Sequence, residues 1–118
     1  RSNTPQQALA LLNDPTYVEA ARVLAERTVR EGGENVESRL GWLFRRTLAR
    51  TPEDWEREAL AKLFEEQLER YSADEPAARK MIAHGEFPVA KDIPPAELAA
   101  WVSVSRVMLN LHETITRN

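Results

Sequence analysis

The chain has 118 residues, a formal net charge of −3 and no cysteine. This length fits one domain with one core, and the mildly acidic balance gives no general attraction to nucleic acid or anionic membranes. The lack of cysteine excludes disulfides, zinc–thiolate sites, iron–sulfur clusters and covalent haem attachment within this stretch. No apolar run approaches the ~20 residues of a membrane span. We therefore expect neither nucleic-acid binding nor membrane insertion.

Prolines mark the starts of helix-forming segments along the chain. These segments open at Pro5, Pro15, Pro52, Pro76 and Pro95. Thr4, Asp14 and Thr51 precede three of them as candidate N-caps. No segment shows the period-2 alternation typical of strands. The sequence predicts an all-α fold, an irregular or orthogonal bundle of about six helices in one compact domain over residues 1–118.

The first three helices are expected over residues 5–12, from residue 15 to the Gly32-Gly33 pair, and over 35–50. Glycine accepts the left-handed conformation of a helix C-cap, which explains the Gly32-Gly33 stop. Gly41, inside the third helix, costs up to ~1 kcal/mol relative to alanine. We expect close helix packing to be the reason for this glycine, with the approach of a ligand as the alternative.

The next two helices are expected over residues 52–71 and 75–84, with Gly85 as a C-cap and a loop over 86–94. Thr51 to Asp54 is close to a capping box. The outer face of the first of these helices is acidic, and it places two pairs at the favourable spacing and order for ion pairing. The pairs are Glu58–Lys62 and Glu66–Arg70.

The last helix, expected over residues 95–115, is the most apolar. At helical spacing its inward face comprises Leu98, Trp101, Val102, Ser105, Met108, Leu109 and His112, widened by Val104, Val107, Leu111 and Ile115. A surface helix needs an apolar arc of only about 100°, so the sequence predicts a central helix covered by other helices on most sides. The remaining polar stripe comprises Ser103, Arg106, Asn110, Glu113 and Arg117.

Both ends of the chain resemble a known family. Residues 1–15 read RSNTPQQALALLNDP, residues 17–21 read YVEAA, and residues 109–117 read LNLHETITR. These stretches, with the Gly32-Gly33 pair and Ala99-Ala100-Trp101 between them, resemble the planctomycete-specific domain PSD-one, the domain-of-unknown-function family 1553. The resemblance covers nearly the whole chain.

The resemblance implies the C-terminal part of a much larger, exported protein that carries a cytochrome-c-like domain and a second uncharacterised domain upstream. It supplies no catalytic or binding residues. The family leads us to expect an acidic or amide residue at position 112, where this chain has His112, which argues against an invariant site there. The start at Arg1, without methionine, agrees with an excised piece, and any targeting signal would then lie upstream.

Two histidines raise the question of haem or metal binding. His84 and His112, with Met81 or Met108, could serve as axial haem ligands. However, a Cys-x-x-Cys-His motif is absent, and the helix dipole favours a histidine near a helix C-terminus without any function. His112 and Glu113 are adjacent, so their side chains point roughly 100° apart and do not form a metal site. We expect no haem, metal or other cofactor.

The charged clusters favour structural roles over chemistry. Acid–base hydrolysis needs two carboxylates that face each other across a cleft, whereas the acidic residues here crowd one helix and its ends. They are Glu53, Asp54, Glu56, Glu58, Glu65, Glu66, Glu69, Asp74 and Glu75. A basic concentration could bind carboxylate, sulfate or phosphate, but we favour pairing with the acidic helix. It comprises Arg39, Arg45, Arg46 and Arg50.

Among the three tryptophans, Trp101 is expected in the core and Trp55 partly exposed, where an aromatic side chain favours contact with a partner or a sugar. No catalytic motif is recognisable. We therefore hypothesise a non-catalytic structural or interaction module of a large exported, cytochrome-associated protein. The proposed docking surface for the polypeptide preceding Arg1 comprises Arg106, Asn110, Glu113 and Arg117. The alternatives are the helical part of an extracellular polysaccharide-processing enzyme whose active site lies upstream, and a redox-partner module.

Overall fold

The computed structural model describes residues 15–83 and 88–117 and contains five helices in these ranges, with no strand among them. The helices are α2 (Pro15–Glu31), α3 (Val36–Leu48), α4 (Asp54–Ser72), α5 (Glu75–Ile82) and α6 (Pro95–Arg117). The all-α prediction is confirmed. The predicted helix over residues 5–12 and the Gly85 cap lie outside the described residues. No helix within them is both long and apolar enough to cross a membrane.

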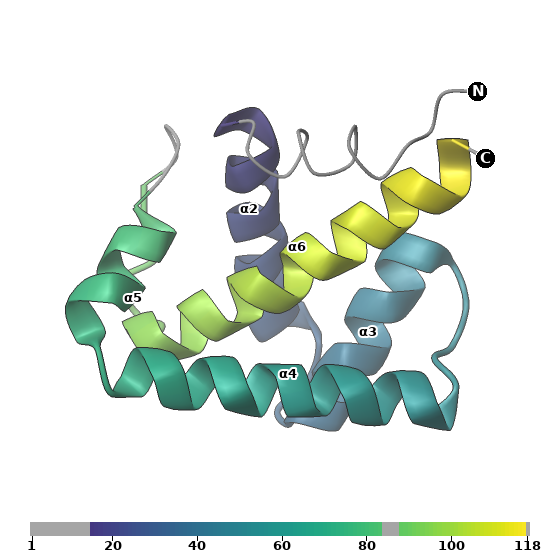
Figure 1. The fold of residues 1–118 in the computed structure, drawn as a ribbon, viewed down its shortest axis with the longest axis horizontal. Coiled ribbons are helices and arrows are strands. Elements are labelled where there is room, and N and C mark those ends of the chain that lie inside the picture. Colours follow the sequence, from purple (N-terminus) through teal and green to yellow (C-terminus); the bar gives the residue numbers. More distant parts are fainter. Residues whose placement is uncertain (1–14, 84–87, 118) are drawn as a thin grey trace.

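The N-terminal half of α6 forms the centre of the core, as predicted. Figure 1 shows α6 running diagonally past α2, α3, α4 and α5, and it contacts all four. Trp101 is fully buried, and its ring lies with its centroid 4.4 Å from that of Phe64 on α4. The fully buried neighbours of Trp101 on the same helix are Leu98, Ala99, Ala100, Val102, Val104 and Met108.

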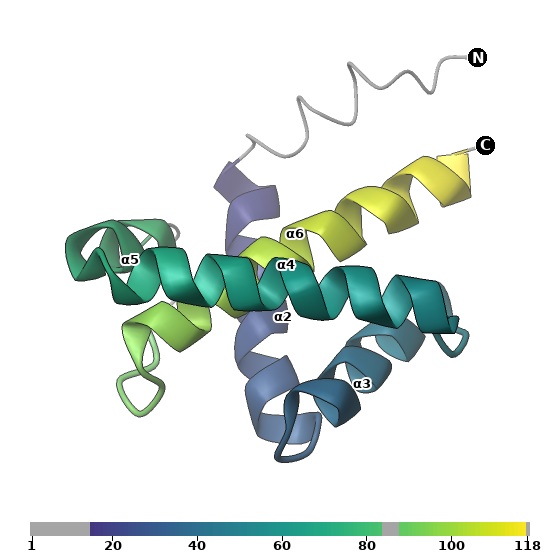
Figure 2. The ribbon, with the colours of Figure 1, turned by 60° about the horizontal axis from the view of Figure 1, so that its bottom comes forward.

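The C-terminal half of α6 corrects the prediction of cover on most sides. Val107 and Leu111 are 37% and 38% exposed, and His112, expected on the inward face, is also exposed. Figure 2 shows the reason: α4 and α6 diverge, so that the last turns of α6 lie apart from α4. An apolar arc is buried only where a neighbouring helix follows it.

Local capping fixes the helix starts. The Asn35 side chain accepts a hydrogen bond from the Ser38 backbone N–H at 2.8 Å, so α3 begins at Val36. The predicted N-cap of α4, Thr51, is wrong, since Glu53 takes this place. The Glu53 N–H donates to the Glu56 carboxylate at 2.8 Å, which moves the capping interaction two residues along the chain. The carboxylate of Asp74 caps α5 by accepting from the Ala77 N–H.

The predicted glycine stop after α2 is confirmed. Gly33 has a φ of +99°, and a Cβ on Gly32 would lie 2.5 Å from the Thr28 carbonyl oxygen, so both positions favour glycine. Arg39 of α3 locks this turn, because its guanidinium donates to the carbonyls of Gly33 and Val29.

Two smaller expectations about α4 need correction. The ion pairs between described side chains include neither Glu58–Lys62 nor Glu66–Arg70, and the Arg70 guanidinium lies 5.1 Å from the centre of the Tyr71 ring. The gain from such exposed pairs is small enough that other contacts of the same side chains outweigh it.

Candidate functional site

The predicted docking residues lie on the C-terminal half of α6. Arg106, Asn110 and Glu113 follow at spacings of four and three residues, which places them on one helix face, and each is half-buried. The guanidinium of Arg106 reaches α5, where its Nη1 lies 3.9 Å from the Met81 sulfur. Arg117 ends the helix, and its side chain lies outside the described ones. We call Arg106, Asn110 and Glu113 the α6 stripe.

Tyr17, in the first turn of α2, faces the α6 stripe. Burial and the negative charge of Glu113 raise the pKa of the Tyr17 phenol to about 12, while the positive charge of Arg106 acts in the opposite direction. The Tyr17 hydroxyl and the Asn110 Oδ1 are buried and have no hydrogen-bond partner among the described residues. An unpaired buried polar group costs ~1–3 kcal/mol, so these two atoms are a local cost of packing α2 against α6.

Arg22 on α2 is a buried charge that the sequence pattern did not identify. It is 2% exposed, donates to the Ile82 carbonyl at the end of α5 at 3.1 Å, and lies 3.8 Å from Glu19. The available signal was its place beside Ala21, on the edge of the apolar stripe of α2. Its visible contacts join α2 to α5, which is a structural role.

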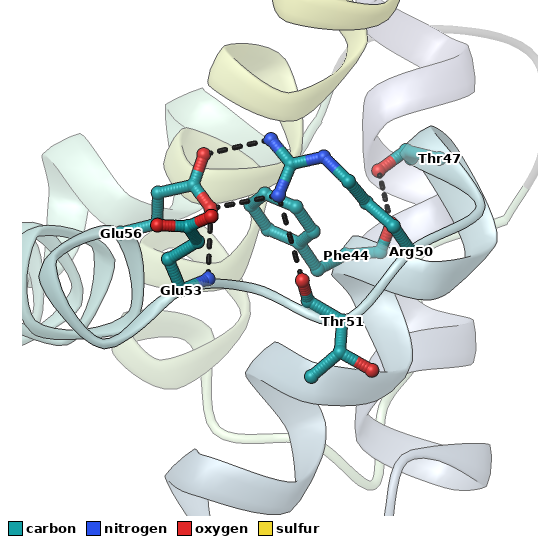
Figure 3. Close-up of polar contacts among 6 residues, drawn as sticks. All are labelled: Phe44, Thr47, Arg50, Thr51, Glu53 and Glu56. Atoms are coloured by element: carbon teal, nitrogen blue, oxygen red, sulfur yellow. Dashed lines mark hydrogen bonds and ion pairs between the residues drawn. The ribbon is translucent and has the colours of Figure 1, made fainter.

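The basic concentration on and after α3 is divided among different partners. Arg50 pairs with Glu56 of α4 at 2.8 Å, and this bond, with the Glu53 N–H, lowers the pKa of Glu56 to about 2. Figure 3 shows Glu56 held from both sides. Arg39 pairs instead with Glu97 of α6 at 3.1 Å. The expected pairing with the acidic helix is therefore correct for Arg50 and wrong for Arg39.

The other two arginines of this group lie on the solvent side of α3. Arg46 lies 5.5 Å from the centre of the Trp42 ring, and Arg27 of α2 lies 5.6 Å from the same centre. The Arg45 side chain forms no hydrogen bond or ion pair with the described residues. Arg45 and Trp42 line an open concavity of about 820 Å³ between the Gly32-Gly33 turn, α3 and the connection to α4. We call this the α3 concavity.

Gly41 lies in the α3 concavity and not in a helix–helix contact. The three heavy atoms nearest to a Cβ built on Gly41 all belong to the Arg45 side chain, the closest being Nη1 at 3.2 Å. The expectation that close helix packing explains this glycine is therefore wrong, because no neighbouring helix contributes these atoms.

The remaining candidates are spread over the molecule. The predicted acidic residues are exposed except for Glu56, as expected of a solvated face. Met108 is buried, His112 is exposed, and His84 lies outside the described residues. In the described part of the chain, no three His, Cys, Asp or Glu side chains gather as metal ligands would. Trp101 is fully buried and Trp55 is 68% exposed, which confirms both predictions.

The structure thus defines an all-α domain with a polar surface on α6 and a separate concavity on α3. The model of the family described as PSD1, protein of unknown function (DUF1553), matches residues 1–64. This is more than half of the 118 residues, and the chain belongs to this family. No curated protein and no solved structure matches the chain. The family match ends within α4, so the resemblance of residues 109–117 stays a prediction.

Proposed function

We propose that this domain is a non-catalytic structural or interaction module that docks on other parts of a larger polypeptide through the α6 stripe. The observation that carries the proposal is the half-buried polar face of Arg106, Asn110 and Glu113 beside apolar side chains that are left in solvent. Exposed Val107 and Leu111 lie on the same half of α6. Half-buried polar side chains next to exposed apolar ones are features of a surface completed by another segment.

The proposed occupant is the polypeptide that precedes residue 1. Tyr17 lies in the first turn of α2, and its pKa responds to Glu113 and Arg106. The chain therefore enters α2 beside the α6 stripe. The family resemblance adds the setting: the C-terminal part of a large exported planctomycete-type protein with a cytochrome-c-like domain.

Docking changes how much the residues of the α6 stripe contribute to the free energy of unfolding. An exposed i,i+4 pair contributes well under 1 kcal/mol to stability. When the same groups are desolvated and paired against a partner, removing one of them lowers the free energy of unfolding by ~1–3 kcal/mol. The difference between these two values distinguishes a docked stripe from a solvated one.

The test compares Glu113→Ala in the 118-residue chain and in a longer protein that includes the preceding domains. We expect the loss of unfolding free energy to be ~1–3 kcal/mol larger in the longer protein. Glu66→Ala, at an exposed position on α4, is the matched control and should have equal, small effects in both. Equal, small effects of Glu113→Ala as well would rule out docking through Glu113.

Two alternative functions keep the same docking surface but change what lies against it. The domain would be the helical part of an extracellular polysaccharide-processing enzyme if the docked segment carried a facing acid pair or a metal cluster. It would be a redox-partner module if that segment carried a Cys-x-x-Cys-His haem site. Cross-linking from position 113 in the longer protein identifies the segment and separates these alternatives.

A further inference from the structure

The α3 concavity is independent of the α6 stripe, and its central feature is Gly41. Glycine inside a helix costs up to ~1 kcal/mol relative to alanine, and here close helix packing does not explain it. The space above Gly41 is filled by the tip of a flexible side chain, the Arg45 guanidinium. The missing Cβ makes room for the Arg45 guanidinium to lie close to the α3 backbone on the side of the concavity.

Gly41 and Arg45 form the floor of the α3 concavity. Most other arginines around this floor are held in ion pairs with neighbouring carboxylates. Arg27 forms two bonds with Glu31, at 2.9 and 3.2 Å, and Arg57 pairs with Asp54. Arg45 differs from them, since its side chain bonds to no group within residues 17–83 and 88–114. It is a cation held over the floor of a concavity with all its donors unused.

The walls restrict the ligand class further. The guanidinium groups of Arg27 and Arg46 already lie over the Trp42 ring. This ring is therefore held in place and is not free to stack on a ligand. Ser38 and Thr51 supply hydroxyl groups, and Glu37 supplies a carboxylate acceptor, whereas both Glu31 oxygens already accept from Arg27. The Glu37 carboxylate opposes a dianion such as phosphate, whereas a monoanion whose other groups are hydroxyls suits both Arg45 and Glu37.

We propose that the α3 concavity binds a polyhydroxylated carboxylate, of which a uronic acid is the representative. The Arg45 guanidinium holds the carboxylate in a two-bond fork over Gly41. Glu37, Ser38 and Thr51 bind the ligand hydroxyls. The concavity, at about 820 Å³, falls within the ~300–1,000 Å³ range of small-molecule sites.

The experiment is an NMR titration of the ¹⁵N-labelled chain with galacturonate, with galactose and inorganic phosphate as comparison ligands. We expect saturable shifts at the amides of Gly33, Ser38 and Gly41 for galacturonate, with a Kd on the order of 1 mM. Galactose and phosphate should bind at least ~10-fold more weakly, as expected when one charge-assisted fork is lost or opposed.

Variants of the floor test the assignment. Arg45→Gln should raise the galacturonate Kd by about 10-fold or more, since it removes the fork. Arg79→Gln, an exposed arginine on α5 paired with Glu75, is the matched control and should leave the Kd unchanged. Gly41→Ala places a Cβ 3.2 Å from the present position of the Arg45 Nη1. It should weaken galacturonate binding, while the NMR spectrum of the variant remains that of a folded domain.

Three outcomes would overturn the proposal. The first is the absence of saturable shifts, and the second is an unchanged Kd in Arg45→Gln. The third is binding of phosphate or galactose as tight as that of galacturonate, which would contradict the ligand class. None of these measurements depends on the α6 stripe, so the two proposals stand or fall separately.

Discussion

The two halves of α6 are one continuous helix in two different environments. In the N-terminal half, Leu98, Trp101 and Val102 have no exposed surface, whereas in the C-terminal half Val107 and Leu111 are 37% and 38% exposed. Both halves carry apolar side chains at helical spacing. The difference comes from the neighbours, because α4 and α6 diverge toward the C-terminus (Figure 2).

This contrast separates stability from interaction along a single helix. The first half is committed to the core, where large side chains contribute roughly 1.5–3 kcal/mol each. Beyond the fully buried Met108, the second half carries half-buried polar groups and exposed apolar ones, which contribute little to the stability of the isolated domain. Substitutions in the two halves test whether the boundary lies where the structure places it.

The largest effect is expected at Trp101. Trp101→Ala removes a fully buried ring that lies against Phe64, and it should reduce the unfolding free energy by ~3–5 kcal/mol. Trp55→Ala is the control, because Trp55 is 68% exposed and its loss should cost less than ~0.5 kcal/mol. Both are measured by urea unfolding. A loss below ~1 kcal/mol for Trp101→Ala would contradict a central α6.

The same substitution in each half places the boundary more sharply. Leu98→Ala, at a fully buried position, should cost ~2–5 kcal/mol because it leaves a cavity. Leu111→Ala, at a 38% exposed position, should cost less than ~1 kcal/mol, since part of this side chain is already in water. Equal costs in urea unfolding would mean that the C-terminal half is as well covered as the N-terminal half.

Periodicity and local rules predicted much of this fold. The apolar spacing of residues 95–115 predicted a central helix and a buried Trp101, and the glycine pair predicted the end of α2. These features depend on the 3.6-residue period and on backbone conformation, which are properties of short stretches.

Other features depend on tertiary neighbours and were not accessible in the same way. The exposure of Leu111 follows from the divergence of two helices, and the cap at Glu53 replaces Thr51 where Arg50 holds the Glu56 carboxylate. The shape of the concavity at Gly41 depends on the conformation of the long Arg45 side chain. For the α6 stripe, the polar face was readable from the sequence, but Tyr17 opposite it was not.

Titration of the Tyr17 phenol tests whether Tyr17 lies opposite the α6 stripe. With a folded-state pKa of about 12 against an ordinary value of 10.0, the unfolded chain ionises first. Stability contributed by neutral Tyr17 is therefore present below pH 10 and lost as pH rises toward 12. Tyr17→Phe should remove this part of the pH dependence.

The α6 stripe should modulate the same titration in opposite directions. Glu113→Gln should lower the pKa of Tyr17 and Arg106→Gln should raise it, because each removes one of the charges that act on the phenol. The tyrosinate absorbance, taken as a difference from Tyr17→Phe, isolates this group from the second tyrosine of the chain. An unchanged pKa in both variants would show that the stripe does not face Tyr17.

The smallest effects are expected at two serines of α6 that differ in hydrogen bonding. The Ser103 Oγ donates to the Gln67 Oε1 of α4 at 3.1 Å, so Ser103→Ala should cost ~0.5–1.5 kcal/mol. Ser105 is fully buried, but its Oγ has no partner among the described residues. Ser105→Ala should therefore be neutral or slightly stabilising, because alanine removes a desolvated hydroxyl and is the better helix former.

Urea midpoints at constant slope measure both serine variants. The pair separates burial from hydrogen bonding, because the more deeply buried serine is expected to be the more dispensable one. If Ser105→Ala costs as much as Ser103→Ala, the Ser105 hydroxyl has a partner in solution, and the N-terminal half of α6 is then held to its neighbours by polar contacts as well as by apolar packing.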